Sequence, residues 1–335
     1  KIKRVPCYHT KKQPSTTRLE GGDTFNLEKG DRLVHQIANG TKGKGINMSL
    51  CDKIKAGKFI ITSEIGPPKG IDIEEVLNDA ELIKGRVDAI NVTDLQSSVM
   101  RVGSLAICKL LIERGLEPVF QITCRDRNRL ALQSDLLSAA VFGIKNILAL
   151  TGDHPTLGDH PQAKPVFDLD SIQLLEAIKT LQSGKDMAGK ELKKAPEFCV
   201  GGVVNPGADP LEPEIIKMEK KIQSGAQFFQ TQAIYDIELF KKFLDAAKHL
   251  KTTIIAGIVL LKSAGMAKYM NKNVSGVFVP DSLIEEMDKA KDKGATSIEI
   301  AARLIKELKP ISGGIHIMPI GWDKKVPLVL DAATL

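Results

Sequence analysis

The chain has 335 residues, of which 43% are hydrophobic and 26% charged, so it is long enough to bury one large α/β core. It contains no apolar run near the roughly 18 residues that cross a bilayer and no basic-aromatic pattern typical of nucleic-acid binding. No apolar segment follows the basic start of the sequence, so we expect no secretory signal. Five widely spaced cysteines without a CxxC argue against a disulfide framework or a structural zinc site and indicate a reducing cytoplasm.

The net charge of +6 is concentrated at the start of the chain. Residues 1–50 hold ten Lys or Arg and four Asp or Glu, so the remainder is neutral. We therefore expect a basic N-terminal extension over residues 1–45, followed by a folded core over residues 46–335. The extension fits either a solvated, weakly ordered segment or an arm that wraps the core or docks an acidic partner subunit.

Beyond the extension, short runs rich in Val, Ile and Phe alternate with amphipathic segments. The expected strands are 59–65, 88–93, 118–124, 146–151, 198–204, 227–232, 253–259 and 314–318. The expected helices include 72–85, 100–114, 128–143, 210–225, 236–249 and 281–309, with loops at 153–167 and 183–195. Continuous apolar runs are typical of parallel strands covered on both faces, and eight of them separated by helices predict a (β/α)8 TIM barrel. A doubly wound sheet is the alternative, but no GxGxxG follows any strand.

The first expected strand ends in an unusual way, because KFIITSEIGPPKG (58–70) places Glu64 directly before Gly-Pro-Pro. In a barrel, chemistry is carried out at the carboxyl ends of the strands. An isolated carboxyl there can act as a general acid, held in one direction by the prolines. The alternative is a structural role, in which Glu64 accepts hydrogen bonds from loop amides.

Other strand ends are also polar. ALTGDHP (149–155) places Asp153 where a carboxylate could stabilise a developing cation, although it could equally cap a turn. The repeated Gly-Asp-His-Pro raises a metal site through the acids and histidines of residues 153–160, but the segment is turn-rich, so we expect a loop over the site and no metal. Gln232 could read a flat heterocycle through its amide or be satisfied by backbone.

Two groups of basic residues follow strands three and five, and either could hold a phosphate or form a solvated face. They are Arg125, Arg127 and Arg129, and Lys217, Lys220 and Lys221.

Taken in order, SEIGPP, FQITCRDRN, LALTGDHP, KKIQSGA and TQAIYD resemble the methylenetetrahydrofolate reductase family, over about residues 46–323. The likeness is greatest to the short bacterial form of acetogens, which has no regulatory domain. The resemblance implies a flavin-containing barrel that reduces 5,10-methylenetetrahydrofolate to 5-methyltetrahydrofolate. It also implies NAD(P)H or an electron-delivering partner subunit as the donor, and an oligomer or hetero-complex.

The resemblance implies a role for each motif residue. Glu64 would protonate the folate nitrogen, Asp153 would favour the iminium cation, and Gln232 would contact the pterin. Trp322, which follows the last expected strand, is also expected to bind the substrate. The implied cofactor-binding residues are Thr93, Gln121, Thr123, Arg125, Thr151, Gly152, Asp153, Asn205, Asp209, Lys217, Lys220 and Lys221.

The chain departs from the family pattern at Thr151, where better-known members have arginine. That change weakens a pyrophosphate contact, so FMN is an alternative to the FAD that is usual in the family, with Arg125 or Lys221 neutralising its phosphate. Two other functions stay open on the residues alone: a pterin-dependent methyltransferase barrel, and a non-catalytic barrel subunit of a larger complex.

Overall fold

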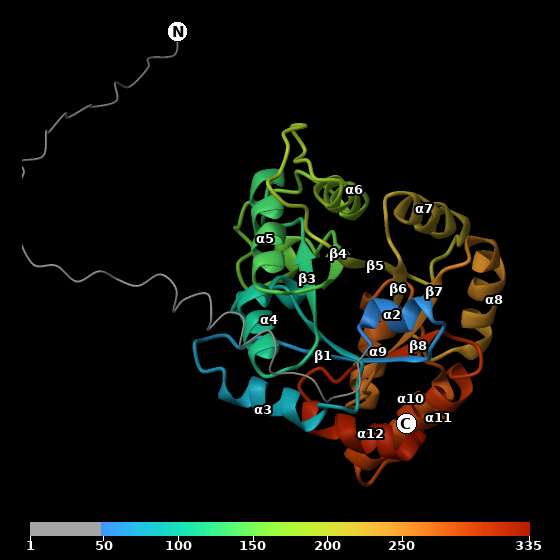
Figure 1. Ribbon diagram of the computed structural model, residues 1–335. Helices are drawn as coiled ribbons and strands as arrows, with labels where there is room; N and C mark the ends of the chain where they lie inside the picture. The colour runs from blue at the N-terminus through green and yellow to red at the C-terminus, as the bar shows by residue number, and fades with distance from the viewer. Residues whose placement is uncertain (1–47) are drawn as a thin grey trace, which may run out of the picture. The chain divides into compact units, whose positions relative to one another are not determined.

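Eight parallel strands close into a barrel in the computed structural model, which describes residues 48–335 (Figure 1). Each strand pairs with its neighbours in chain order, and the first pairs with the last. The strands are β1 (Ile60–Ile65), β2 (Ala89–Val92), β3 (Pro118–Thr123), β4 (Asn146–Leu150), β5 (Cys199–Val204), β6 (Phe228–Ala233), β7 (Thr253–Val259) and β8 (Gly314–Met318). The predicted TIM barrel is confirmed, and the predicted extension over residues 1–45 lies outside the described residues.

Helices surround the strands, and most lie where the amphipathic segments predicted them. They are α2 (Leu50–Lys55), α3 (Glu74–Leu82), α4 (Ser104–Glu113), α5 (Arg129–Val141), α6 (Ser171–Gln182), α7 (Glu212–Gln223), α8 (Ile237–Ala247), α9 (Ala264–Asn273), α10 (Asp281–Lys289), α11 (Lys293–Leu308) and α12 (Val326–Ala333). Short 3₁₀ turns are η1 (Gln96–Ser98), η2 (Pro155–Leu157), η3 (Lys248–Leu250) and η4 (Asp323–Lys325). Within residues 48–335, no helix is long and apolar enough to span a bilayer.

The single helix expected over 281–309 is two helices, α10 and α11. Asp292 begins the second, because its side chain accepts hydrogen bonds from the amides of Gly294 and Ala295. A carboxylate in that position satisfies donors that a continuous helix would bond internally, so it marks a new start.

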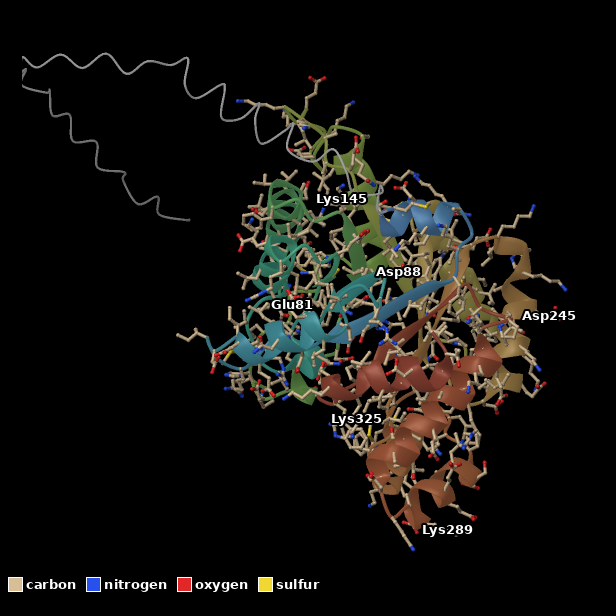
Figure 2. All side chains as sticks on the ribbon, turned by 60° about the horizontal axis from the view of Figure 1, so that its bottom comes forward. Glu81, Asp88, Lys145, Asp245, Lys289 and Lys325 are labelled. Carbon is tan, nitrogen blue, oxygen red and sulfur yellow. The ribbon has the colours of Figure 1, made fainter. Side chains whose placement is uncertain are left out.

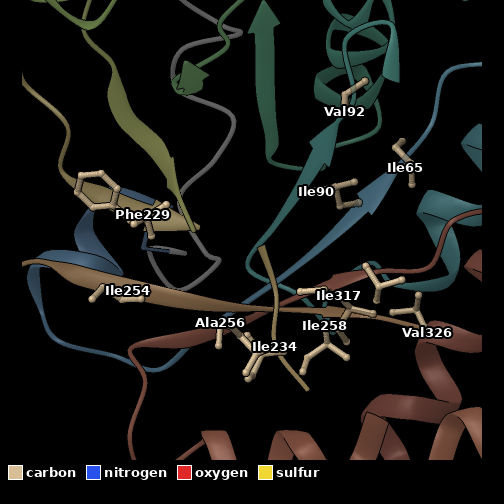
Figure 3. Close-up of a cluster of buried hydrophobic side chains, with 14 of the residues drawn as sticks. Ile65, Ile90, Val92, Phe229, Ile234, Ile254, Ala256, Ile258, Ile317 and Val326 are labelled. Carbon is tan, nitrogen blue, oxygen red and sulfur yellow. The ribbon is translucent and has the colours of Figure 1, made fainter. Parts of the chain in front are cut away.

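The main core lies between the outer faces of the strands and the helices. Figure 3 shows part of it, where Ile65, Ile90 and Val92 from β1 and β2 and Ile258 and Ile317 from β7 and β8 are buried. Charged side chains such as Asp245 and Lys289 project outward from the helices (Figure 2). This apolar layer fixes the barrel wall, on which the positions of the strand ends depend.

A second, smaller core fills the amino end of the barrel. Leu50 and Ile54 of α2 pack against Ile60, Val119 and Phe228, which point into the barrel from the starts of their strands. Figure 1 shows α2 lying across this end. With the amino end closed by apolar side chains, the carboxyl ends of the strands carry the polar residues.

Candidate active site

A cavity of about 350 Å³ opens at the carboxyl ends of β1 to β6. Its size is in the range of small-molecule sites. Most of the residues singled out from the sequence line it, namely Glu64, Thr93, Gln121, Thr123, Arg125, Thr151, Gly152, Asp153, Asn205, Lys221 and Gln232. Residues far apart in the sequence meet here because every strand runs in the same direction.

Glu64 lies in β1 near the floor of the cavity and is 8% exposed. Gln96 Nε2 donates to its Oε1 at 3.1 Å, and Gln121 Nε2 donates to its Oε2 at 3.3 Å. His316 Nε2 lies 3.8 Å from Oε2, because the pairing of β1 with β8 sets Thr62 opposite His316. The carboxyl is therefore held by groups from three other parts of the barrel.

The Gly-Pro-Pro turn after Glu64 is anchored from outside. Arg101 Nη1 donates to the Pro67 carbonyl at 3.0 Å, and the Val102 amide donates to the Pro68 carbonyl at 3.0 Å. These bonds tie the turn to the segment before α4. They limit the movement of the strand end that carries Glu64.

Beneath Glu64 a buried polar layer crosses the barrel. Asn91 and Gln230 exchange two side-chain hydrogen bonds of 2.7 and 3.1 Å, and Gln230 Nε2 also donates to Thr62 Oγ1 at 3.3 Å. Thr62 Oγ1 lies 2.9 Å from His316 Nδ1, so the layer leads to the imidazole beside Glu64. All four side chains are buried, and their mutual bonds satisfy groups that would otherwise be costly to bury.

Sequence reasoning missed several of these residues, namely Asn91, Gln96, Gln230 and His316. A signal for some of them was present, because polar residues recur at every second position in otherwise apolar strands. Asn91 precedes Thr93, and Gln230 precedes Gln232, by one such step. In a strand that spacing places both side chains on one face, here the barrel interior.

Arg125 is fully buried, and each of its three side-chain nitrogens donates to a protein oxygen. Its Nε and Nη2 donate to Asp126, Nη1 donates to the Asp153 carbonyl at 3.3 Å, and Nη2 donates to the Leu95 carbonyl at 3.3 Å. Arg125 thus ties together the loops after β2, β3 and β4. With these donors engaged, it lacks the exposed guanidinium that a phosphate would need.

The other two arginines of that loop also make ion pairs. Arg127 donates to Asp94 Oδ2 at 2.7 Å, and the Thr123 hydroxyl donates to the same oxygen at 2.9 Å. Arg129 pairs with Asp168 at 2.9 Å. These residues support the loop, and Thr123 lines the cavity with its hydroxyl proton already engaged.

Asp153 follows Gly152, whose φ of +92° is a left-handed conformation that suits glycine. A Cβ there would lie 3.1 Å from the Cβ atoms of both Thr123 and Arg125, so the loop packs closely on β3. The Asp153 side chain is exposed at the cavity, and its carboxylate accepts no hydrogen bond from the described chain. It is therefore able to face a ligand.

Polar groups suited to a cofactor lie around Thr93. The Thr93 hydroxyl is buried at the cavity with no hydrogen-bond partner within residues 48–335. Lys221 Nζ donates to the Val203 carbonyl at 2.6 Å, and burial lowers the pKa of this lysine, with Glu214 opposing the shift. A polar ligand in the cavity could accept hydrogen bonds from both this hydroxyl and the desolvated ammonium group.

Gln232 reaches the cavity from β6 at an irregularity in the sheet. The register between β6 and β7 shifts between Gln230 and Ala233, and the Thr231 hydroxyl accepts from the Gly257 amide at 2.9 Å. Asn205 also lines the cavity, and its side-chain amide donates a hydrogen bond to the Ser275 carbonyl at 3.0 Å.

Four of the sequence-predicted residues do not line this cavity. Asp209, Lys217 and Lys220 are exposed, before α7 or on its surface. Trp322 lies after β8, with the ammonium groups of Lys262 and Lys325 at 5.6 and 4.9 Å from its ring centre.

Asp323, next to Trp322, was not expected from the sequence. Burial raises its pKa to about 6, and the nearby carboxylates of Asp79 and Glu64 add to the shift.

No three His, Cys, Asp or Glu side chains in the described part of the chain are placed to share a metal ion. In the Gly-Asp-His-Pro repeat, His154 Nδ1 lies 2.9 Å from the Thr156 hydroxyl. Asp159 pairs with Lys69 and His160 and accepts from the Met100 amide, and these contacts, that of Lys69 first, hold its pKa well below the usual range. The repeat therefore folds as a loop that packs beside the cavity.

The family model described as methylenetetrahydrofolate reductase matches residues 49–334. The chain belongs to the methylenetetrahydrofolate reductase family. Methylenetetrahydrofolate reductase 2 of Schizosaccharomyces pombe is 27% identical over 320 residues, which cover 86% of this chain and 47% of the yeast protein. The chain thus spans about half the length of that relative. The 5,10-methylenetetrahydrofolate reductase of Pectobacterium carotovorum is 28% identical over 221 residues, covering 64% of this chain and 68% of the relative.

Among solved structures, a Clostridium thermocellum protein described as binding two copies of 5-methyl-5,6,7,8-tetrahydrofolic acid has a TM-score of 0.56. It is 17% identical, and the match covers 84% of this chain and 94% of that one, so the likeness supports the fold. The resemblance to the methylenetetrahydrofolate reductase family that the motifs predicted is confirmed.

Proposed function

We propose that this member of the methylenetetrahydrofolate reductase family reduces 5,10-methylenetetrahydrofolate to 5-methyltetrahydrofolate with a bound flavin. The observation that carries the proposal is the setting of Glu64. A buried carboxyl lies at the end of β1 and is oriented by two amides. It lines a cavity whose other walls hold an exposed carboxylate and a hydroxyl that has no hydrogen-bond partner among residues 48–335. The Clostridium protein of the same fold is described as binding the product of this reaction.

The cavity has groups that suit a flavin. The Thr93 hydroxyl and the Thr151–Gly152 segment would contact the ring system, and Lys221 would pair with the ribityl or phosphate oxygens. When bound, the flavin would supply the hydride that reduces the methylene carbon. Because Arg125 is engaged with Asp126, Lys221 is the cation left for a phosphate within this cavity. Whether the flavin is FMN or FAD follows from chromatography of the cofactor released by denaturation.

Glu64 is the group that would hold the proton for the substrate. Opening the five-membered ring of the folate needs a proton on the departing nitrogen, and a carboxyl at hydrogen-bond distance supplies it. Gln96 and Gln121 keep the carboxyl pointed at the cavity, which limits the loss of orientation before the proton moves. Ring opening leaves a cationic iminium, and the exposed carboxylate of Asp153 would favour that charge. Gln232 would bind the pterin edge, with Trp322 contacting the substrate beyond the cavity.

The electron donor in this proposal is NAD(P)H or a partner subunit within an oligomer or hetero-complex. The basic residues 1–45 would dock an acidic electron-delivering partner, an attraction that salt would weaken. Deleting residues 1–45 should abolish partner-dependent activity while preserving activity with a dye donor. Equal activity in both assays, with unchanged complex formation on a sizing column, would show that the extension has no such role.

The visible absorption spectrum of the purified protein tests the main proposal. A bound flavin gives an oxidised spectrum that bleaches on reduction and returns when methylenetetrahydrofolate is added, with methyltetrahydrofolate as product. A colourless protein that neither takes up flavin nor forms this product would rule the proposal out.

A further inference from the structure

Two thiols lie at the closed end of the barrel, opposite to the cavity. Cys51 lies on α2 and is partly exposed, whereas Cys199 is the first residue of β5 and is 3% exposed. Cys51 packs against the small apolar cluster at the amino end of the barrel, of which Cys199 is a member. The pair therefore combines one thiol that solvent reaches with one that it does not.

The two thiols differ in chemical character although both belong to this one small cluster. The neighbouring Cys199 thiol and the charge of Lys55 lower the pKa of Cys51 to about 7 despite partial burial. The neighbouring Cys51 and burial raise the pKa of Cys199 well above its usual range. By contrast, burial raises the pKa of Cys108, and that of Cys124 to about 12, so these two are protonated and shielded.

We propose that Cys51 and Cys199 form a thiol pair that hydroperoxides convert to a disulfide. The Cys51 thiolate attacks a peroxide oxygen, the O–O bond breaks, and the departing hydroxide takes up a proton to leave as water. The Cys51 sulfur is then a sulfenic acid. The Cys199 sulfur loses its proton and attacks it, the S–O bond breaks, and a second water leaves. Two thiols and one hydrogen peroxide thus give one disulfide and two waters.

The pattern of a solvent-reached, ionisable thiol beside a buried second thiol is typical of redox-sensitive sites. Here the product would be a covalent link between α2 and β5. Because the link closes a long stretch of chain, it would stabilise the barrel against unfolding. It lies at the amino end, so it would act without touching the residues that line the cavity.

The test treats the full chain with a small excess of hydrogen peroxide, blocks remaining thiols, and maps peptides by mass spectrometry. We expect a peptide pair that joins Cys51 to Cys199, lighter by two hydrogen atoms than its parts, with Cys108 and Cys124 still alkylatable after unfolding. Oxidised protein should unfold at a higher Tm, and a thiol reductant should reverse the shift.

Cys199→Ala provides the matched control, because alanine fits an apolar cluster. In this variant Cys51 should accumulate as sulfenic acid that dimedone traps, with no rise in Tm. The proposal is overturned if wild-type Cys51 stays reduced, pairs with another cysteine or another molecule, or accumulates as sulfenic acid to the same extent as in the variant. The peptide map of the oxidised wild-type protein tests the proposal even if Cys199→Ala does not fold.

Discussion

Replacing Glu64 by glutamine removes the proposed proton donor and changes little else. The new side chain has the same shape, and the amides of Gln96 and Gln121 can rotate to exchange donor for acceptor. Each bond joins an amide donor to a carboxyl oxygen at 3.1 or 3.3 Å, so the free energy of unfolding should change by no more than about 1–2 kcal/mol. Flavin should bind as before, because Thr93 and Lys221, the residues proposed to hold it, are unchanged.

The rate of methylenetetrahydrofolate reduction should fall by about 10²–10⁴-fold, which is the usual contribution of a positioned general acid. Stopped-flow oxidation of the reduced flavin by the folate measures this step directly. Reduction of the flavin by its donor should keep the wild-type rate, since no folate nitrogen is protonated there. Glu238→Gln, an exposed change on α8, is the matched control. A wild-type rate of folate reduction in Glu64→Gln would refute the role of Glu64.

Three further predictions follow from the same geometry. Asp153→Asn should weaken folate binding and raise the flavin potential, because the anion proposed to face both rings is lost. Spectroelectrochemistry and a folate titration that both match the wild type would show that Asp153 is only a loop residue. Asp323→Asn should stabilise the protein at pH 8 by about 1–2 kcal/mol, the pKa shift to about 6 being discounted for partial exposure. Because the pKa is raised in the folded state, the wild type loses this disadvantage as the pH falls through 6 towards 4. The free energies of unfolding of wild type and Asp323→Asn in urea should therefore agree at pH 4. A difference between them that is the same at pH 4 and pH 8 would contradict the prediction. Gly158→Ala should cost about 1–3 kcal/mol and disturb the loop beside the cavity, because its Cβ would lie 1.8 Å from the Ser98 carbonyl oxygen; Gly70→Ala, with no atom within 4 Å, is the control, and equal Tm values would contradict the reasoning.

The barrel and the strand ends could be predicted because they depend on local patterns. Apolar runs of strand length, each followed by an amphipathic segment, suffice to place Glu64 and Thr93 at one end of a parallel barrel. The helices that were missed have weaker signals. α6 begins with a capping box at Asp170. This short motif can be recognised as a helix start only when the end of the preceding loop is already known. α2 is six residues long, too short for its pattern to stand out.

The partners of the site residues could not be predicted, because they depend on register and on unusual backbone. Gln96 reaches Glu64 from a turn in which Leu95 and Ser97 have positive φ without being glycine. The sequence suggests that Arg125 is a free cation, but in the fold it donates hydrogen bonds to Asp126 and to the carbonyls of Leu95 and Asp153. Such differences arise from the closure of the barrel, which no local pattern records.

The amide pair of Asn91 and Gln230 has a consequence for how the barrel can be observed. These side-chain amide hydrogens lie between β2 and β6 with almost no exposure, and they bond to each other and to Thr62. They should therefore exchange with deuterium on the timescale of opening of the whole barrel, whereas surface amides exchange at once. Slowly exchanging proton signals from these two side-chain amide groups would then report in an NMR spectrum on the integrity of the fold, without any ligand.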